Sequence, residues 1–277
     1  MNPTSTQNET CQICQHGLST GYRPWHFVCP HCGYEKSNLQ PVINLQSSHQ
    51  LINENDREIG LKKIRIKNFR KILKSIRSIQ PHGNKCLDVG CGHGWFLELA
   101  KKDFEVFGIE PDNSIFNKIK SQPDFLIRIG FFPDALKENE KFDVIVFNDV
   151  IEHIPNTKSI INSCYTHLNE DGLLVLNLPS SDGVFYKLSK IFYCLGFPGF
   201  FERMWQKDLP SPHLHYFNHK NLNDLLEKNR FNIKIIDNLP TISLGGLYER
   251  ITYASNFTAI VHIFLYIGIV LLLPLLY

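Results

Sequence analysis

The sequence has 277 residues, longer than one typical domain and short for two full ones, so we expect one main domain with appendages. The formal net charge of +2 gives no reason to expect nucleic-acid binding, because the basic excess is small and no basic cluster is interleaved with aromatics across the chain. The first ten residues lack a basic segment followed by an apolar run, so no secretory signal is expected and the main domain should be cytoplasmic.

Four cysteines near the amino terminus form two C-x2-C pairs separated by fourteen residues: Cys11, Cys14, Cys29 and Cys32. This spacing can place four thiolates tetrahedrally around one zinc ion, so residues 1–40 are predicted to form a zinc ribbon. Two disulfides are the alternative, which a reducing cytoplasm disfavours. A ribbon this small is more often a structural or docking element than a catalytic one, because four cysteines leave the metal no open coordination position.

Residues 40–55 are polar and lack periodicity, which is typical of a linker. Residues 56–80 carry apolar side chains on one helical face and basic side chains on the other. We expect a long helix that packs on the core with a solvated basic side, and binding of that side to an anionic surface is the alternative. The main domain is predicted to extend over residues 56–254.

The stretch 85–100, KCLDVGCGHGWFLELA, organises the main domain, because a short apolar run ends at an acid and then passes through three alternate glycines. It predicts a buried parallel strand over 86–89, a tight turn, and a helix over 95–100. Gly90, Gly92 and Gly94 allow a positive φ and let a ligand approach without meeting a Cβ atom. The pattern therefore predicts a nucleotide cradle.

The identity of the nucleotide follows from what the loop lacks. A dinucleotide fingerprint needs a third glycine where Trp95 stands. Asp88, two residues before the first glycine, suits a cationic ligand better than a diphosphate. Glu110, after a predicted strand over 105–109, stands where an acid accepts hydrogen bonds from both ribose hydroxyls. These two acids suit S-adenosylmethionine.

The sequence resembles class I S-adenosylmethionine-dependent methyltransferases over about residues 56–237, in four blocks: LDVGCGHG, GIEPD, FDVIVFNDVIEHIPN and EDGLLVLNLP. The sequence of the third block is most similar to the branch that contains ubiquinone-type O-methyltransferases and many enzymes of glycan and lipid biosynthesis. The resemblance implies an α/β fold with a Rossmann-like doubly wound sheet. It also implies the residues that contact S-adenosyl-L-methionine: Arg70, Asp88, Gly90, Cys91, Gly92, Gly94, Glu110, Pro111, Asn148, Asp149 and Val150.

Two positions in this set carry particular expectations. In ubiquinone-type relatives an arginine at the distance of Arg70 before the glycines binds the methionine carboxylate. The family commonly has an acid just after the third strand for the adenine amine, but here Gly130-Phe131-Phe132 intervenes before Asp134. Among them, Phe131 could stack on the base or belong to the core.

The remaining elements of the main domain are predicted as a helix over 112–121 and strands over 125–129, 143–147, 170–179 and 233–237. The strand over 143–147 would deliver Asn148, Asp149 and Val150 to the carboxyl edge of the sheet, where ligands of open α/β sheets bind. A seventh, antiparallel strand normally completes the family's fold. Residues 247–254 could supply it; otherwise the sheet is incomplete or closed by part of the apolar tail.

Three histidines are candidate catalytic residues. His153 would lie beside the methyl donor, where an imidazole with a near-neutral pKa suits a general base for an acceptor hydroxyl. Related chains carry this histidine at a helix start whatever they methylate, so a structural role is the alternative. His213 and His215, in SPHLHYFN, fall between the fifth and sixth strands, and either could orient the substrate.

Two apolar segments point to lipid. The family's variable, acceptor-selecting insertion, here 182–209, contains VFYKLSKIFYCLGFPGFF, which must be buried against the domain, a partner or lipid. The carboxyl-terminal tail, 256–277, is apolar from residue 259 except for His262. As a helix, residues 259–277 would reach about 28 Å, close to the thickness of a bilayer core, while an in-plane hairpin and a buried core segment are the alternatives.

The sequence thus predicts a cytoplasm-facing methyltransferase attached to the inner face of a membrane through its tail. It would use S-adenosyl-L-methionine and a structural zinc ion, and would methylate a hydroxyl of a glycan, a lipid-linked sugar or a similar amphiphile. Quinone O-methylation is the close alternative. The alternative from another class is a docking protein that binds the cofactor without catalysis.

Overall fold

The computed structural model describes residues 9–44, 54–121, 124–242, 247–248, 262–263, 266–267 and 270, with backbone alone at 54–59. The strands of this part of the chain are β1 (Ser19–Thr20), β2 (His26–Val28), β3 (Glu35–Ser37), β4 (Lys85–Val89), β5 (Glu105–Glu110), β6 (Leu126–Ile129), β7 (Phe142–Asn148), β8 (Leu168–Asn177) and β9 (His215–Tyr216). The helices are α1 (Glu54–Ile79), α2 (Trp95–Ala100), α3 (Asn113–Ile119), the 3-10 helix η2 (Ile151–His153), α4 (Thr157–His167), α5 (Val184–Cys194), α6 (Pro198–Met204) and α7 (His219–Lys228).

The central sheet has five parallel strands in the order β6-β5-β4-β7-β8. In the middle strand, Leu87 pairs with Phe107 of β5 on one side and with Ile145 of β7 on the other. Because the chain leaves β4 first toward one neighbour and later toward the other, the connections diverge at its carboxyl end and leave a crevice there. The predicted doubly wound α/β fold is confirmed.

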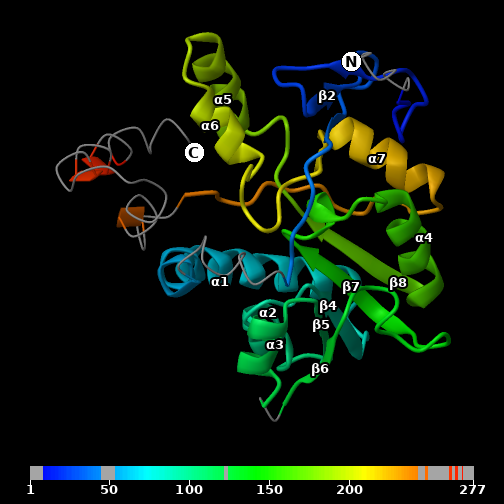
Figure 1. Ribbon diagram of the computed structural model, residues 1–277. Coiled ribbons are helices and arrows are strands. Elements are labelled where there is room, and N and C mark those ends of the chain that lie inside the picture. Colours follow the sequence, from blue (N-terminus) through cyan, green and yellow to red (C-terminus); the bar gives the residue numbers. More distant parts are fainter. Residues whose placement is uncertain are drawn as a thin grey trace.

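Helices cover both faces of this sheet (Figure 1). Side chains alternate between the faces, so Leu87 and Ile145 pack toward α4 and α7, whereas Cys86 and Val144 pack toward α1 and α2. The long helix predicted over 56–80 is α1, and its apolar side chains, including Phe69, belong to the second of these cores. Two buried faces explain why the central strands read as nearly continuous apolar runs.

The amino-terminal strands form a second sheet that takes in a strand of the main domain. Its order is β1-β2-β3-β9, and β9 lies 178 residues beyond β3 in the chain, as the difference between Ser37 and His215 shows. Glu35 pairs with Tyr216, and Lys36 pairs with His215, in antiparallel register. Figure 1 shows these strands above α7 and beside α5. The cysteine-rich segment is therefore joined to the main domain by backbone hydrogen bonds and is not a separate module.

The strand predicted over 233–237 is wrong. These residues are described, but they have no strand partner, and Ile235 and Ile236 stay about half exposed. Alternating apolar residues favour an extended chain. A β-strand also needs a neighbouring strand that can form backbone hydrogen bonds with it, and a local sequence pattern does not encode that neighbour. Consequently β8 lies at the end of the sheet order in the described chain. Of the candidate closing strand over 247–254, only Leu247 and Tyr248 lie within the described residues, and both are helical.

No helix in the described part of the chain is both long and apolar enough to cross a bilayer. The predicted tail, 256–277, is described at only five positions: His262, Ile263, Tyr266, Ile267 and Val270. The spanning and hairpin predictions for the tail therefore lie outside the described residues.

Candidate active site

A cavity of about 140 Å³ opens at the carboxyl end of β4, in the crevice between the diverging connections. Residues from α1, the glycine loop and the end of β7 line it: Leu61, Arg65, Phe69, Asp88, Gly90, Cys91, Gly92, His93, Trp95, Phe96, Ile115, Asn148, Asp149 and Val150. Seven of the residues predicted to contact the cofactor are thus brought to one cavity wall: Asp88, Gly90, Cys91, Gly92, Asn148, Asp149 and Val150.

The three glycines of the loop adopt the positive φ that the sequence predicted, at 67°, 52° and 73° for Gly90, Gly92 and Gly94. A Cβ atom on Gly90 would lie 2.7 Å from Val150 Cγ2, whereas one on Gly92 would meet nothing within 4 Å. The first glycine therefore permits close packing of the loop on the end of β7. The second leaves open space on the cavity side, where a ligand can approach the backbone.

Asp88 is buried at the floor of the cavity and accepts a hydrogen bond from Asn148 Nδ2 at 3.3 Å. Burial raises its pKa from an ordinary 3.8 to about 8, and the charge of Glu110 adds to this rise, while the Asn148 hydrogen bond opposes it. A cation that enters the cavity would favour the ionised carboxylate. The site is therefore poised to exchange a proton for a positively charged ligand.

Glu110 is oriented by backbone donors on both carboxylate oxygens. The Gly92 N–H donates to Oε2 and the Asp112 N–H donates to Oε1, both at 2.8 Å. Burial raises the pKa of Glu110, although these two hydrogen bonds oppose the rise. Each oxygen keeps a second lone pair, so the carboxylate can accept from a ribose diol beside the glycine loop.

The linker crosses this edge of the site. Asn44 Nδ2 donates to the carbonyl oxygen of Pro111 at 2.7 Å, and the Asn113 N–H donates to Asn44 Oδ1 at 3.0 Å. The first contact lies in the loop that follows Glu110, and the second lies at the first residue of α3. The amino-terminal segment thus supports the loop that carries the predicted ribose acid, a role that the polar, aperiodic linker sequence did not reveal.

The arginine that reaches the cavity is Arg65, whereas the sequence analysis selected Arg70. Arg65 Nη2 donates to Asp149 Oδ2 at 2.9 Å, while Arg70 is exposed and is not among the cavity-lining residues. Five helical positions correspond to a rotation of about 140° around α1, which explains why the two side chains diverge. The signal that could have found Arg65 is its spacing of four from Leu61 and Phe69, which puts all three on one face.

Phe131 is 58% exposed and lies outside the cavity lining, so it belongs to neither the core nor the described cavity wall. The structure therefore supports neither of the two roles considered for it.

The three predicted catalytic histidines have different surroundings. His153 donates from Nδ1 to the carbonyl oxygen of Pro212 at 2.8 Å, so its Nε2 keeps a lone pair, 3.9 Å from Glu152 Oε1. Glu152 is fully buried, and both its oxygens lack a hydrogen-bond partner among the described residues. Burial raises the pKa of Glu152 well above its ordinary value. His153, Glu152 and His213 each offer a ligand or proton-accepting atom within 4.8 Å of the others.

The other two histidines have both ring nitrogens engaged by protein groups. His213 Nε2 accepts from Gln206 at 2.9 Å and Nδ1 donates to the hydroxyl of Tyr216 at 3.1 Å. His215 Nε2 donates to the carbonyl oxygen of Ile154 at 2.9 Å, and Nδ1 accepts from the Tyr34 hydroxyl at 2.5 Å. Burial lowers the pKa of both, to about 4 for His215. The substrate-orienting role considered for them does not fit these contacts, which are structural.

A family model described as a methyltransferase domain matches residues 61–234, which is more than half of the chain. The chain belongs to the methyltransferase domain family. Two similar proteins are ubiquinone biosynthesis O-methyltransferases. The one from Glaesserella parasuis serovar 5 (strain SH0165) is 36% identical over 34% of this chain and 45% of the relative. The mitochondrial one from Rattus norvegicus is 33% identical over 40% of this chain and 35% of the relative. The chain thus spans less than half the length of these relatives.

Solved structures agree with this family in fold. A Haloferax volcanii methyltransferase, determined in complex with the Trm112 methyltransferase activator, superimposes with a TM-score of 0.55 at 12% identity, over 73% of this chain and 83% of that one. A SAM-dependent methyltransferase from Thermotoga maritima superimposes with a TM-score of 0.50 at 17% identity, over 66% and 79%. The methyltransferase domain is therefore of the class I, Rossmann-like type.

The four amino-terminal cysteines meet at one point beside the methyltransferase domain. Their sulfur atoms all lie within 4.8 Å of one another, with Cys11 and Cys32 at 3.6 Å and Cys14 and Cys29 at 3.4 Å. Zinc–sulfur bonds of about 2.3 Å give tetrahedral edges of about 3.8 Å, so the cluster fits a zinc ion. A disulfide would need about 2.05 Å, and all eight cysteines are free. Gly33, at a φ of 69°, makes a sharp turn directly after the last cysteine.

Sequence reasoning missed how firmly the methyltransferase domain holds this cluster. Asn218 and Asn221, at the start of α7, both donate to the carbonyl oxygen of Cys32 at 3.2 Å. Lys228, at the end of the same helix, donates to the carbonyl oxygen of Ile13 at 2.6 Å. No local signal marks these residues as ribbon contacts, because they are about 190 to 215 positions away in the chain.

Proposed function

We propose that the chain transfers the methyl group of S-adenosylmethionine to a hydroxyl of a glycan, a lipid-linked sugar or a similar amphiphile. The observation that carries the proposal is the placement of two buried carboxyls at the glycine loop: Asp88 lines the cavity, and Glu110 accepts a hydrogen bond from the Gly92 N–H. One buried carboxyl lies where a cationic group would sit, and the other presents fixed oxygens where a ribose diol would sit. No nucleic-acid partner is proposed.

The residues of the cavity wall would bind and align the donor. When bound, S-adenosylmethionine supplies a methyl group that its sulfonium charge already activates. Arg65 would face the methionine carboxylate in place of Arg70, since it is the arginine that reaches the cavity. Asp88 would offset the cationic groups, and Glu110 would hold the ribose. Their combined effect is alignment for an in-line displacement, the main way in which a protein speeds such a transfer.

Transfer to a hydroxyl also requires a proton acceptor. The methyl carbon gains a bond to the acceptor oxygen as its bond to sulfur breaks, and the hydroxyl proton must leave. We propose that His153 accepts this proton, because the hydrogen bond from its Nδ1 to the carbonyl oxygen of Pro212 orients the imidazole ring. The Glu152 carboxyl lies 3.9 Å from His153 Nε2, and an imidazolium there would favour ionisation of this carboxyl, which burial otherwise keeps protonated.

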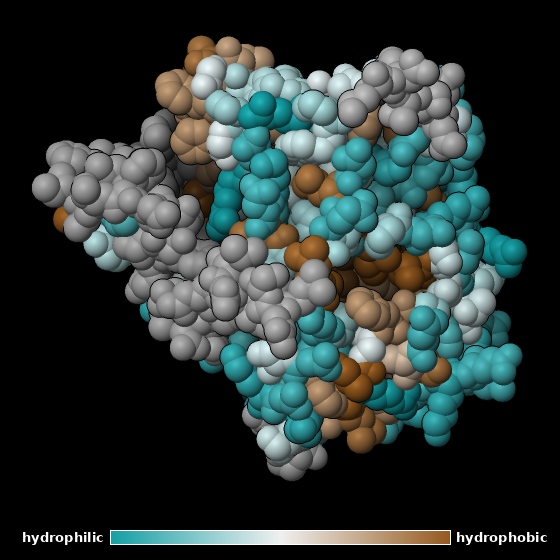
Figure 2. Space-filling model, viewed as in Figure 1, coloured by the Kyte–Doolittle hydropathy of each residue, from teal (hydrophilic) through white to brown (hydrophobic). Residues whose placement is uncertain are grey.

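An amphiphilic acceptor is supported by the exposed side of α5. Six apolar side chains, here called the apolar stripe, recur at helical spacing and remain 37% to 65% exposed: Val184, Phe185, Leu188, Ile191, Phe192 and Leu195. Figure 2 shows the brown and tan surface that gathers over the α5–α6 end of the molecule. Much of the stripe stays exposed in the described part of the chain, although Phe192 packs against Phe200 of α6. We therefore propose that it meets lipid at the cytoplasmic face of a membrane, with the apolar tail as a second attachment.

We further propose that Cys11, Cys14, Cys29 and Cys32 hold one structural zinc ion. The spread of their sulfur atoms and the absence of disulfides among the eight free cysteines support this. Metal analysis of protein purified without added zinc should find about one equivalent. Metal-free protein with two intact disulfides would contradict it.

Two alternatives remain as outcomes of the experiment. Quinone O-methylation is favoured by the similarity to ubiquinone biosynthesis O-methyltransferases. A docking protein without catalysis is disfavoured by the intact acids and glycine geometry.

The test is to incubate the chain with methyl-labelled S-adenosylmethionine and a membrane extract, then to identify labelled products by mass spectrometry. Glu110→Ala, which should bind the cofactor more weakly, is the control. Label in a glycan or lipid-linked sugar supports the proposal. Label in a quinone supports the close alternative, and cofactor binding without any transfer supports the docking protein.

A further inference from the structure

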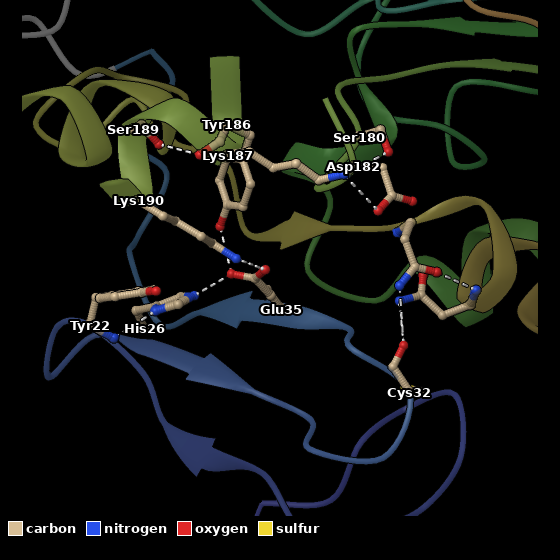
Figure 3. Close-up of polar contacts among 12 residues, drawn as sticks. Tyr22, His26, Cys32, Glu35, Ser180, Asp182, Tyr186, Lys187, Ser189 and Lys190 are labelled. Carbon is tan, nitrogen blue, oxygen red and sulfur yellow. Dashed lines mark hydrogen bonds and ion pairs between the residues drawn. The ribbon is translucent and has the colours of Figure 1, made fainter. Parts of the chain in front are cut away.

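The ribbon is fastened to the acceptor-side insertion by one buried carboxylate. Glu35 of β3 is 3% exposed and lies among three donors (Figure 3). His26 Nε2 and the Tyr186 hydroxyl approach Oε2 at 2.8 and 2.6 Å, and Lys190 Nζ approaches Oε1 at 2.5 Å. Burial would raise the pKa of Glu35, but these hydrogen bonds and the Lys190 charge outweigh it and the pKa is lowered. The carboxylate is therefore ionised and fully engaged.

Helix α5 has two faces with separate partners. Tyr186, Ser189, Lys190 and Tyr193 follow one another at spacings of three, one and three, so they share the face that meets the ribbon. Tyr186 and Ser189 on this face are buried, and the Tyr193 hydroxyl donates to the carbonyl oxygen of Tyr22. The apolar stripe lies on the opposite, exposed side. Whatever fixes the ribbon face of α5 therefore also fixes the direction in which the stripe points.

A second set of contacts holds α6 to the same part of the ribbon. Phe201 and Trp205 are fully buried and pack against Tyr22 and Trp25. Arg23 forms an ion pair with Glu202 at 2.5 Å. The insertion thus contacts the ribbon along both of its helices.

The ribbon side of this joint depends on the cysteine cluster. His26 lies three residues before Cys29, and Glu35 lies three residues after Cys32, so this C-x2-C pair closes the β2–β3 hairpin that presents both side chains. A metal ion at the cluster would lock that hairpin. Loss of the metal would free the hairpin ends and separate Glu35 from its donors on α5.

We propose that Glu35 is a positioning residue for the acceptor side, through which the metal-closed ribbon sets the placement of α5 and α6. The ribbon then helps to shape the acceptor site and does not serve as a docking module for another protein. The link to the acceptor rests on the proposed function, whereas the mechanical coupling does not. No ribbon residue lines the cofactor cavity, so the coupling should act on one half of the site alone.

The experiment breaks the joint from the α5 side and leaves every cysteine in place. In the full chain, Tyr186→Phe with Lys190→Met removes two of the donors to Glu35. Lys190→Arg is the conservative rescue. Lys187→Met is the matched control, because Lys187 lies on the same helix but points toward Asp182, at 3.8 Å, and away from Glu35 (Figure 3). Hydrogen exchange of residues 184–204, zinc content and S-adenosylmethionine affinity are measured for each.

We expect amide exchange over 184–204 to accelerate about tenfold or more in the double variant and in wild-type protein stripped by a chelator. Exchange of β4 to β7 and cofactor affinity should stay within twofold. Lys187→Met should match wild type, and Lys190→Arg should restore most of the protection. In a transfer assay with labelled cofactor, the double variant should transfer methyl groups more slowly than wild type at low concentrations of membrane extract. At high extract concentration its rate should return to that of wild type, and its KM for the cofactor should be unchanged.

Two results would overturn the inference. One is unchanged protection of 184–204 after both the double substitution and chelation. The other is simultaneous loss of protection across β4 to β7, which would make the ribbon a requirement for the whole fold. If the coupling is seen but no cofactor binds, the proposed function and the link to the acceptor fail, while the mechanical coupling of the ribbon to α5 stands.

Discussion

The cofactor side and the acceptor side of this molecule are encoded in different ways. The cofactor side is built from β4, its glycine loop and the acid after β5, and its key contact, Gly92 to Glu110, joins residues 18 positions apart. The acceptor side is assembled from the ribbon, α5, α6 and β9. Its contacts join residues 151 positions apart, as in Glu35 and Tyr186, or 181, as in Tyr34 and His215. The comparison shows that a local motif can specify a ligand cradle, whereas the acceptor side depends on long-range packing.

The strongest test of this difference is substitution of the loop glycines. Gly90→Ala places a Cβ atom 2.7 Å from Val150 and forces a residue with a side chain to a positive φ. The left-handed backbone costs about 1–2 kcal/mol and overpacking about 1–3 kcal/mol, so cofactor affinity should fall more than tenfold. Gly92→Ala meets open space and should show the backbone cost alone. Calorimetric affinities for S-adenosylmethionine measure both.

Gly199→Ala on α6 is the control, because its Cβ atom would meet nothing within 4 Å. An equal loss of cofactor affinity in this variant would show that the two sides are not separable.

Removal of the ribose acid should have the next largest effect. Glu110→Ala deletes an oriented charged acceptor, which costs about 1–3 kcal/mol of binding free energy. The matched control is Glu98→Ala, an exposed acid on α2 that pairs only with Lys101 among the contacts described. Equilibrium binding of S-adenosylmethionine should weaken in the first variant and not in the second. Wild-type affinity in Glu110→Ala would remove Glu110 from the site.

These local features are the ones that the sequence could predict. Three alternate glycines after a buried strand require a positive φ, and Asp88 and Glu110 follow from their places around that loop. Arg65 was not predicted, because the candidate arginine was chosen by its distance before the glycine motif and not by the face of α1 on which it lies. The strand over 233–237 failed because pairing needs a partner edge, which lies elsewhere in the chain.

The acceptor side could not be predicted for the same physical reason. The pattern of 182–209 showed that apolar side chains needed a partner. In the structure, α5 leaves several of them exposed on one side, while Lys190 on the other side contacts Glu35 of the ribbon. The histidines in SPHLHYFN looked catalytic because imidazole is chemically versatile. Only the fold shows that His213 and His215 are enclosed and bonded at both nitrogens.

A pH titration of cofactor affinity should test the role of Asp88 on the cofactor side. Burial raises the pKa of Asp88 to about 8 from 3.8, so below pH 8 a cationic ligand must displace a proton. Cofactor affinity should therefore rise with pH, by at most about tenfold per unit, and level off above pH 8. The same raised pKa makes the Asp88 contribution to the stability of the ligand-free protein fall as pH rises from about 4 to about 8.

Asp88→Asn is the control for the titration, because any remaining pH dependence belongs to the ligand or to other groups. Parallel affinity curves for the two proteins would show that Asp88 does not titrate on binding.

The smallest effect per residue is expected at the apolar stripe. Leu188→Ser and Ile191→Ser should each weaken partitioning to anionic vesicles by about 1 kcal/mol, because both side chains are already partly buried. Leu126→Ser is the control, because Leu126 is as exposed as Ile191, at 56%, and lies on β6 at the far end of the molecule from α5 (Figure 1). Vesicle sedimentation measures the difference. Equal partitioning of all three variants and wild type would argue against lipid contact by the stripe.

The most direct test of the account is calorimetric titration of metal-loaded protein with S-adenosylmethionine and, in parallel, with S-adenosylhomocysteine. The account predicts binding of one molecule per chain for both ligands, with affinity reduced in Asp88→Asn and in Glu110→Ala while circular dichroism shows the fold intact. Folded wild-type protein that binds neither ligand would contradict the central claim that the crevice at the end of β4 is a methyl-donor site.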